Sequence, residues 1–412
     1  MVNFQRKILD NGLRVLVHED FSTPLCAVNV IYDVGARDES PEKTGFAHLF
    51  EHLMFGGSAN VPDFDDEIQK AGGDSNAFTN NDLTNFYDIL PVENIETALW
   101  LEADRMLQPN LGQESLDVQR KVVVEEFKET CLSQPYGDVW HRMADLAYQV
   151  HPYRWPTIGK DISHIENAKL GDVQEFFKQY YAPNNAALVI AGPIKAERGF
   201  KLAEKWFSEI PANNKLKRQL PIEPVQTIRK ENIKEEPVPI DALYLGFHMP
   251  DRLHPDYYAY DLLSDILANG QSSRLYRNLL KDQELFSSID AFITGSFDPG
   301  LFVVEGKLNN GVTKEIAEAA IWKELDKIKN EIITPIELEK YQNKAESSLI
   351  FSESNILNKA ITLAQFEILG DAELMNKEAE EYQKITTEQI HRIANECFSE
   401  ANCTEIFYKK KD

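Results

Sequence analysis

The chain opens with two short runs in which apolar and polar residues alternate. They span residues 5–9 and 13–18, and residues 10–12, Asp-Asn-Gly, separate them. An Asn-Gly pair between two alternating runs is a strong signal for a β-hairpin, because both residues accept the backbone geometry of a tight turn. A third run, residues 26–34, is rich in β-branched residues and predicts another strand.

Further along, apolar positions recur every three to four residues, which is the period of a helix. Residues 44–55 and 63–71 follow this pattern, and a Gly-Gly pair, a common helix stop, follows each segment. Two segments after them, residues 75–79 and 85–90, predict a pair of strands. The other elements expected in the first half are helices at about 92–107, 114–130, 135–149, 170–180 and 196–210, and a buried strand at 186–191.

The second half repeats the order strand, loop, helix and glycine stop. It follows a charged, proline-containing segment at residues 213–238. A strand is expected at 242–248 and a helix at 258–267, which ends near Gly270. When Gly270 is aligned with Gly56, the repeat has one long period rather than the short period of a solenoid.

This repeat predicts an α+β protein with two similar domains, each a mainly antiparallel sheet packed with helices, related by internal duplication. We expect the first domain at residues 1–212, a linker at 213–238 and the second domain at 239–412. In this alignment residues 48–52 correspond to residues 262–266, which contain no histidine. The expectation is therefore one metal-competent domain and one without a metal motif.

The composition of the chain limits the classes of partner and the location that we expect for it. The 412 residues include 67 acidic and 43 basic side chains, so the formal net charge is -24. Such a surface repels phosphate backbones, so we expect no nucleic-acid partner, and it favours basic peptides. We expect no membrane association, since no apolar segment reaches the length of a span and the N-terminus does not resemble a secretory signal. Four scattered cysteines without a C-x-x-C pair fit a reducing compartment, and we expect a cytoplasmic location.

The segment with the clearest chemistry is His48-Leu-Phe-Glu51-His52, within the predicted helix 44–55. Two histidines four residues apart share a helix face, so both imidazoles can reach one zinc ion. Glu51 lies beside that face, where it can accept a proton from water as a general base. The order H-x-x-E-H is the inverted motif of zinc peptidases, whereas the alternative is a helix with two surface histidines. We predict Zn²⁺ as the cofactor.

A catalytic zinc site needs a third protein ligand and one open position. The predicted helix 114–130 offers three carboxylates, which are Glu125, Glu126 and Glu129. Glu126 lines up with the inward apolar stripe of that helix, and this favours it modestly over Glu125. The pattern alone leaves both candidates open, and a solvated acidic helix end is the alternative.

With these motifs the chain resembles the pitrilysin/insulinase family of inverted-motif zinc peptidases. The resemblance is closer to the short-chain branch of that family, which includes mitochondrial processing peptidase. Residues 45–57 resemble the family's metal helix. Residues 75–79 resemble the strand beside the active site, and residues 122–126 resemble the segment that carries the distal glutamate ligand. The resemblance covers essentially the whole chain.

The resemblance implies a zinc endopeptidase with His48, His52 and Glu126 as metal ligands and Glu51 as the catalytic base. In this family an acidic residue often stands seven positions before the distal glutamate. That position is Gln119 here, so a supporting carboxylate is missing.

The resemblance also implies that Asn76, Ala77, Phe78 and Thr79 form an open strand edge, to which a peptide substrate adds as an extra strand. Backbone hydrogen bonds at such an edge bind many sequences, and side-chain pockets choose among them. An ordinary strand and turn is the alternative for these four residues.

One departure from the family pattern lies in the second half. Active members carry an arginine and a tyrosine, seven residues apart, that hold the substrate and stabilise the oxyanion. The matching positions here are Leu280 and Ser287, and neither side chain can donate as that pair does.

In some members of the short-chain branch, one subunit carries zinc and a second subunit supplies the arginine and the tyrosine. We therefore expect this chain to be the zinc-bearing subunit of a heterodimer with a paralogous subunit, with a homodimer as the alternative. A non-catalytic structural or assembly subunit of the same fold is the competing function. A metal-dependent hydrolase of non-peptide substrates is a third.

Overall fold

The Asp-Asn-Gly turn lies where the alternating pattern predicts it, in a computed structural model that describes residues 1–214 and 218–411. Gly12 has a φ of 86°, and the N–H of Leu9 donates to the carbonyl oxygen of Leu13 at 3.0 Å. The hairpin is therefore formed. Residues 215–217 of the predicted linker and Asp412 lie outside the described residues.

Contacts divide the chain into two compact units, each made of three segments. Unit 1 comprises Met1–Lys128, Trp155–Leu220 and Ile350–Lys377. Unit 2 comprises Glu129–Arg154, Pro221–Leu349 and Glu378–Asp412. Each unit contains one sheet and its own hydrophobic core.

The sheet of unit 1 has the strand order β1-β2-β6-β3-β5-β4. Its strands are β1 (Gln5–Ile8), β2 (Arg14–Glu19), β3 (Leu25–Tyr32), β4 (Asp74–Thr79), β5 (Thr84–Pro91) and β6 (Ala186–Gly192). β2 and β6 run parallel, and the other neighbours run antiparallel. The strands predicted near 26–34, 75–79, 85–90 and 186–191 are all present.

Helices cover both faces of this sheet. The helices of unit 1 are α1 (Phe46–Met54), α2 (Phe64–Lys70), α3 (Ile95–Leu107), α4 (Gln113–Phe127), α6 (Ile162–Glu166), α7 (Leu170–Tyr180), α8 (Ala196–Phe207) and α12 (Ile356–Leu369). Short 3-10 segments are η1 (Ala36–Asp38), η2 (Val92–Asn94), η5 (Pro183–Asn185) and η7 (Ala372–Lys377).

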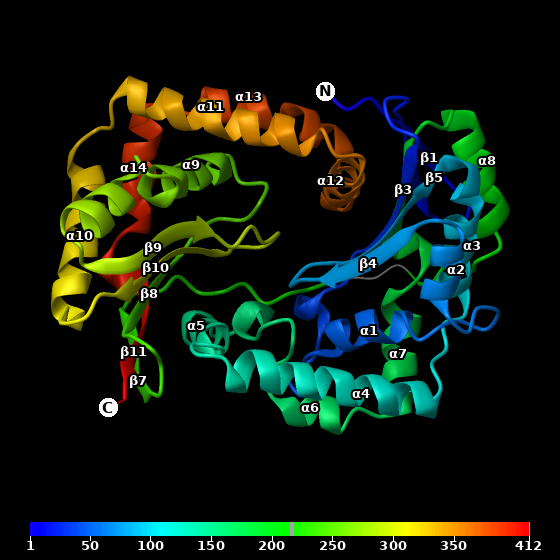
Figure 1. Ribbon diagram of the computed structural model, residues 1–412, viewed down its shortest axis with the longest axis horizontal. Helices are drawn as coiled ribbons and strands as arrows, with labels where there is room; N and C mark the ends of the chain where they lie inside the picture. Colours follow the sequence, from blue (N-terminus) through cyan, green and yellow to red (C-terminus); the bar gives the residue numbers. More distant parts are fainter. Residues whose placement is uncertain (215–217, 412) are drawn as a thin grey trace. The chain divides into compact units, whose positions relative to one another are not determined.

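Successive strand residues point to opposite faces, so a sheet covered on both sides needs continuous apolar strands. On β3, Val28 and Val30 belong to the core that α1, α3 and α8 share. Ala27 and Ile31 are equally buried and point to the other face, where α12 packs on β3 and β6. Figure 1 shows α12 on one side of the sheet and α3 and α8 on the other.

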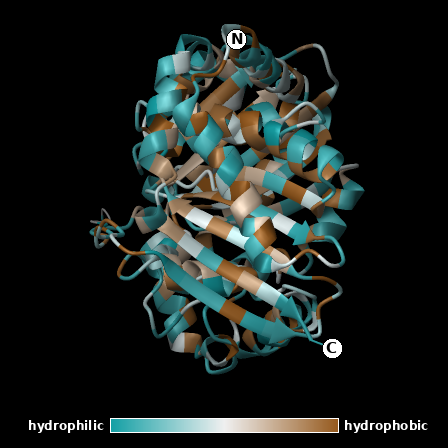
Figure 2. Cartoon of the chain, turned by 90° about the vertical axis from the view of Figure 1, so that its left-hand side faces the viewer, coloured by the Kyte–Doolittle hydropathy of each residue, from teal (hydrophilic) through white to brown (hydrophobic). Residues whose placement is uncertain are grey.

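The sheet of unit 2 has the order β7-β11-β8-β10-β9. Its strands are β7 (Lys230–Glu236), β8 (Ala242–His248), β9 (Phe286–Ile293), β10 (Leu301–Leu308) and β11 (Cys403–Lys410). Its helical segments are η3 (Lys128–Ser133), α5 (Val139–Ala147), η4 (Pro152–Arg154), α9 (Tyr257–Ala268), η6 (Tyr276–Asp282), α10 (Lys314–Asn330), α11 (Pro335–Ser352), α13 (Glu378–Lys384), α14 (Thr387–Cys397) and η8 (Glu400–Asn402). In Figure 2 the strands that run toward the C-terminus carry alternating hydrophobic and hydrophilic segments.

The two sheets share one topology. Without β1, the order β2-β6-β3-β5-β4 corresponds to β7-β11-β8-β10-β9, and the parallel pair β2/β6 corresponds to the parallel pair β7/β11. α1 lies between β3 and β4 in sequence, as α9 lies between β8 and β9. The predicted fold class, two duplicated α+β domains with mainly antiparallel sheets, is confirmed.

Each compact unit contains one helix from the other half of the sequence. α12 comes from the second half and packs on the first sheet, whereas α5 comes from the first half and packs on the second sheet. On α5, Met143 and Ala147 share a buried cluster with Tyr244 of β8. The chain crosses between the units after Lys128, Arg154, Leu220, Leu349 and Lys377. The domain boundaries expected from the sequence therefore mark repeated halves rather than compact units.

The segment 213–238 is not a linker throughout, because β7 lies within it and pairs in parallel with β11. Its sequence, KENIKEE, is charged because β7 is the edge strand of its sheet. Edge strands often carry charges that discourage pairing with other chains, so this strand resembles a linker in composition. In the described part of the chain, no helix combines the length and the apolar character that a membrane span requires.

Candidate metal centre

Three side chains interrupt the burial of α1. His48, Glu51 and His52 are partly exposed, whereas the other residues of this helix are buried. The spacing of the three places them on neighbouring positions of one face. The opposite face, which includes Leu49 and Phe50, packs into the core of unit 1. The hydrophobic periodicity of this helix thus fixes the direction in which the histidines point.

Glu126, near the end of α4, reaches the same point. Its carboxylate oxygens lie 3.7 Å from Nε2 of His48 and 3.3 Å from Nε2 of His52. The two histidine Nε2 atoms lie 3.3 Å apart. Residues from two helices that are distant in sequence therefore bring three ligand atoms within 4.8 Å of one another.

This arrangement fits a zinc ion. Ligands bound at about 2.05 Å around a tetrahedral ion lie about 3.3 Å apart, and three protein ligands leave the fourth position open. The histidine nitrogens lie 3.3 Å apart, and they lie 3.7 and 3.3 Å from the two different oxygens of Glu126, which is close to that value. Two nitrogens and a carboxylate oxygen are also the ligand types that zinc prefers. The donor set is therefore suited to hold a catalytic rather than a closed structural ion.

Glu125, the other candidate ligand, points elsewhere. Its side chain is 72% exposed and pairs with Lys128 at 2.7 Å. Glu129 is exposed as well, and Gln119 is partly exposed on α4. Of the three carboxylates considered, Glu126 is the one that the structure brings to His48 and His52.

Glu51 lies beside the three ligand atoms and interacts with Thr79 at the end of β4. Burial raises the pKa of Glu51, while the neighbouring Thr79 and His52 lower it. A carboxyl group in such a place can be tuned toward the working pH of a general base. Thr79 thereby links the edge strand to the proposed base.

Burial and charge also set the protonation of the ligands. Burial lowers the pKa of His48 to about 4, although the Glu126 carboxylate acts in the opposite direction. The hydrogen bond with His52 lowers the pKa of Glu126. At neutral pH His48 is therefore a neutral imidazole and Glu126 a carboxylate. These are the forms that bind a metal ion.

The strand β4 forms the outer edge of its sheet, with β5 as its one neighbour in the described part of the chain. The register pairs Asn76 with Tyr87 and Thr79 with Thr84. The N–H of Ala77 donates to the side-chain oxygen of Asn76 at 2.8 Å. Figure 1 shows β4 next to α1, so the predicted substrate-binding residues 76–79 lie on an edge beside the histidines.

Leu280 and Ser287, the positions that the resemblance matches to an arginine and a tyrosine, are both held by contacts within unit 2. Leu280 packs against the core of unit 2. The hydroxyl of Ser287, on β9, donates to the carbonyl oxygen of Lys307 at 3.1 Å. Neither residue offers a long donor side chain.

Two residues near the metal centre carry no local sequence signal. Tyr181 is buried and its ring stacks on Phe50, with the ring centres 4.7 Å apart. Burial raises the pKa of Tyr181, and the Glu51 charge adds to the rise. Glu39 is buried as well, and its carboxylate accepts hydrogen bonds from the start of α1. Both lie outside the H-x-x-E-H motif, so only the folded chain reveals them.

Comparison with known proteins matches both halves of the chain. Residues 14–159 match the family described as Insulinase (Peptidase family M16), and residues 167–345 match the description Peptidase M16 inactive domain. The chain is 30% identical over 409 residues to the zinc protease PqqE of Helicobacter pylori, covering 97% of this chain and 91% of that one. It is 24% identical to the mitochondrial-processing peptidase subunit beta of Saccharomyces cerevisiae, covering 94% and 87% of the two chains. A solved structure of a protease from Helicobacter pylori has a TM-score of 0.94 at 28% identity and covers 99% of this chain and 100% of that one.

Proposed function

Because the chain belongs to the insulinase family of peptidases, M16, we propose that it is a zinc-dependent endopeptidase acting on peptides or unfolded segments. The observation that carries the proposal is the convergence of His48, His52 and Glu126 with Glu51 beside them. A subunit without catalytic chemistry needs none of these four groups to keep its fold, since hydrophobic packing stabilises α1 from its other face.

His48, His52 and Glu126 hold the metal in this proposal. A bound zinc ion would polarise the scissile carbonyl and lower the pKa of water toward about 7. Glu51 accepts a proton from the attacking water at its carboxylate oxygen. It then passes that proton to the leaving amide nitrogen as the C–N bond breaks. Thr79, at the end of β4, lies beside the Glu51 carboxylate in this proposal.

The substrate binds to β4 as an added strand. Residues Asn76 to Thr79 offer the edge, and backbone hydrogen bonding there accepts many peptide sequences. The N–H of Ala77 donates only within its own strand, to the Asn76 side chain, in the described residues. That contact is local and is easily exchanged for a substrate carbonyl. An edge that ends at Thr79 delivers the bound backbone toward Glu51.

We further propose that the repeated half at residues 239–412 carries no chemistry of its own and that a paralogous subunit completes the site. Leu280 and Ser287 cannot supply an arginine and a tyrosine. A second copy of this chain would present the same two residues, so a heterodimer is favoured over a homodimer. The similarity to a protein named as a subunit of a processing peptidase supports this view. The cytoplasmic location stays a prediction.

Metal analysis and peptide cleavage test the proposal. We expect about one zinc per chain, lost in Glu126→Ala but kept in the matched variant Glu125→Ala, since Glu125 pairs with Lys128 instead. The purified chain is assayed alone and with its paralogue against a mixture of quenched fluorescent peptides. Cleavage that needs both chains supports the full proposal. Full activity of the lone chain removes the heterodimer. A zinc-free chain that never cleaves peptides favours the structural subunit.

A further inference from the structure

The start of α1 is held by a side chain from outside the helix. Glu39 lies six positions before Gly45, the N-cap residue of α1, and is 7% exposed. Its Oε2 accepts the N–H of Gly45 at 2.8 Å, and its Oε1 accepts the N–H of Ala47 at 2.8 Å. One carboxyl group therefore spans the first turn of α1, immediately before His48.

The helix cannot provide this contact itself. The first N–H groups of a helix have no partner within it, and Ser, Thr, Asp or Asn at the N-cap usually supplies one. The N-cap of α1 is Gly45, with a φ of 85°. A Cβ there would lie 2.8 Å from the carbonyl oxygen of Ile158, so the position requires glycine. Capping must come from elsewhere, and Glu39 supplies it.

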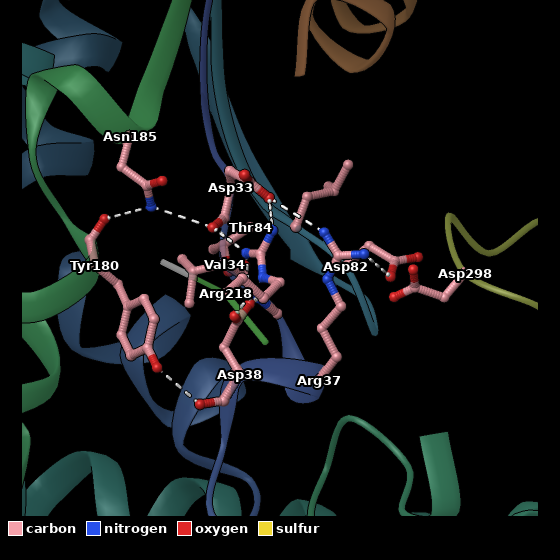
Figure 3. Close-up of polar contacts among 12 residues, drawn as sticks. Asp33, Val34, Arg37, Asp38, Asp82, Thr84, Tyr180, Asn185, Arg218 and Asp298 are labelled. Carbon is pink, nitrogen blue, oxygen red and sulfur yellow. Dashed lines mark hydrogen bonds and ion pairs between the residues drawn. The ribbon is translucent and has the colours of Figure 1, made fainter. Parts of the chain in front are cut away.

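The loop that carries Glu39 is itself fixed. Figure 3 shows Arg218 between Asp33, at the start of this loop, and Asp38, the residue before Glu39. Its guanidinium donates to Asp38 at 2.8 and 3.0 Å and to the side chain of Asp33 at 2.9 Å. The Tyr180 hydroxyl donates to the carbonyl oxygen of Asp38 at 2.9 Å. Glu39 thus extends from an anchored segment rather than from a free one.

The same loop also contacts the end of the edge strand. The N–H of Ala36 donates to the carbonyl oxygen of Asn80 at 3.1 Å, and the N–H of Arg37 donates to that of Asn81 at 2.8 Å. Asn80 directly follows Thr79, which interacts with Glu51. One loop therefore joins the start of the metal helix to the end of the strand beside it.

Unit 2 provides an internal comparison. The matching helix, α9, has Asp256 as its N-cap residue. Within the described residues, the Asp256 side chain makes no capping hydrogen bond to this helix. Its carboxylate instead accepts from Gln389 at 2.8 Å and from Arg392 at 2.6 Å. The buried carboxyl at the first turn accompanies the helix with histidines and is missing, among the described residues, from the helix without them.

We propose that Glu39 is a positioning residue for the metal centre. By holding the N–H groups of Gly45 and Ala47, it sets the rotation of the first turn of α1, and so the direction of His48 and the place of Glu51 against Thr79. This inference rests on the proposed function for its catalytic part. Small displacements in a reacting site are costly, since a shift of about 1 Å can lower a rate about 100-fold.

The test replaces Glu39 by glutamine, which keeps the size of the side chain but leaves one acceptor oxygen for two N–H groups. Zinc dissociation is measured by titration against a competing chelator, and kcat and KM are measured on a peptide that the wild type cleaves. For Glu39→Gln we expect about tenfold weaker zinc binding and a kcat about 10- to 100-fold lower, with KM within about threefold of the wild type. Glu42→Gln, an exposed position in the adjoining segment, should match the wild type.

Arg218→Lys is the second variant, because it keeps the charge but loses the forked contact with Asp33 and Asp38. It should weaken zinc binding in the same direction by about threefold, and it decides the question if Glu39→Gln does not fold. Wild-type zinc affinity and kcat in both variants would overturn the proposal, as would an equal loss in Glu42→Gln. If no protein cleaves peptides but Glu39→Gln still weakens zinc binding, the peptidase fails and the positioning role stands.

Discussion

The two units use the same strand order for different purposes, and the contrast is sharpest between α1 and α9. With Gly56 aligned to Gly270, His48 and His52 of α1 correspond to Leu262 and Ile266 of α9. Both apolar residues are fully buried in the core of unit 2. In unit 2 the corresponding positions thus stabilise the fold, whereas in unit 1 they are the proposed metal ligands.

This contrast shows how a duplicated fold can separate stability from chemistry. Burial of a leucine or isoleucine side chain stabilises a fold by about 1.5–3 kcal/mol. The metal helix gives up that contribution at two positions and exposes them in part. At this helix, the Glu39 carboxylate instead holds the first turn through its hydrogen bonds to the N–H groups of Gly45 and Ala47.

The prediction with the largest expected effect changes one carboxylate in each unit. Glu51→Gln should lower peptide hydrolysis by about 10²–10⁴-fold, the usual contribution of general acid–base catalysis, and zinc should stay bound. Asp265→Asn, at the corresponding position of α9, should leave the rate within about twofold. Initial rates and zinc content report both effects. Comparable losses in the two variants would show that the units are not functionally distinct.

Zinc removal should affect one unit only. A ligand at about 1,000 times its dissociation constant stabilises the protein that binds it by about 4 kcal/mol. Chelation should therefore speed amide exchange in α1 and α4 while α9 and α10 stay unchanged. Hydrogen exchange with mass analysis of peptides measures this. A uniform change across both units would contradict a metal site built only from His48, His52 and Glu126.

Local signals explain why much of the fold was predictable. The Asn-Gly turn, the Gly-Gly pair after α1 and the alternation in residues 75–79 all depend on neighbours in sequence, and each predicted element is present. The edge strand β7 was missed because its charged alternation resembles a linker. His48, His52 and Glu126 could be proposed together because their spacing and the family resemblance converge, and the structure brings their ligand atoms within 4.8 Å of one another. Glu39 could not be proposed, because its contact depends on how the loop folds back.

The exchanged helices, α5 and α12, could not be predicted, because an amphipathic pattern does not state which sheet a helix covers.

These two helices also give the next test. Leu363 of α12 is fully buried, and Met143 of α5 is nearly so. Leu363→Ala should cost about 2–4 kcal/mol and speed exchange in β3 and β6. Met143→Ala should cost a similar amount and act on β8 and β11. If the effects were reversed between the sheets, the helix exchange would be refuted.

The prediction with the smallest expected effect concerns charged side chains buried between β5 and α3 of unit 1. Asp88 of β5 and Glu102 of α3 are fully buried, and Arg105 pairs with Glu102 while its guanidinium lies 4.2 Å from the ring centre of Phe64. One arginine cannot neutralise two carboxylates. Burial and the charge of Glu102 raise the pKa of Asp88, while Arg105 acts in the opposite direction and Asp65 adds to the rise.

A carboxyl group with a raised pKa binds its proton more tightly in the folded state than in the unfolded chain. The wild type therefore loses stability as the pH rises above about 4, the ordinary value for aspartate. Asp88→Asn removes this titration. Between pH 4 and pH 8, the free energy of unfolding of the wild type should therefore fall relative to that of the variant. Urea unfolding at several pH values measures it, with the exposed Asp10→Asn as the control. Parallel curves for Asp88→Asn and the wild type would show that Asp88 has the same pKa in the folded and unfolded states, and would contradict a raised pKa.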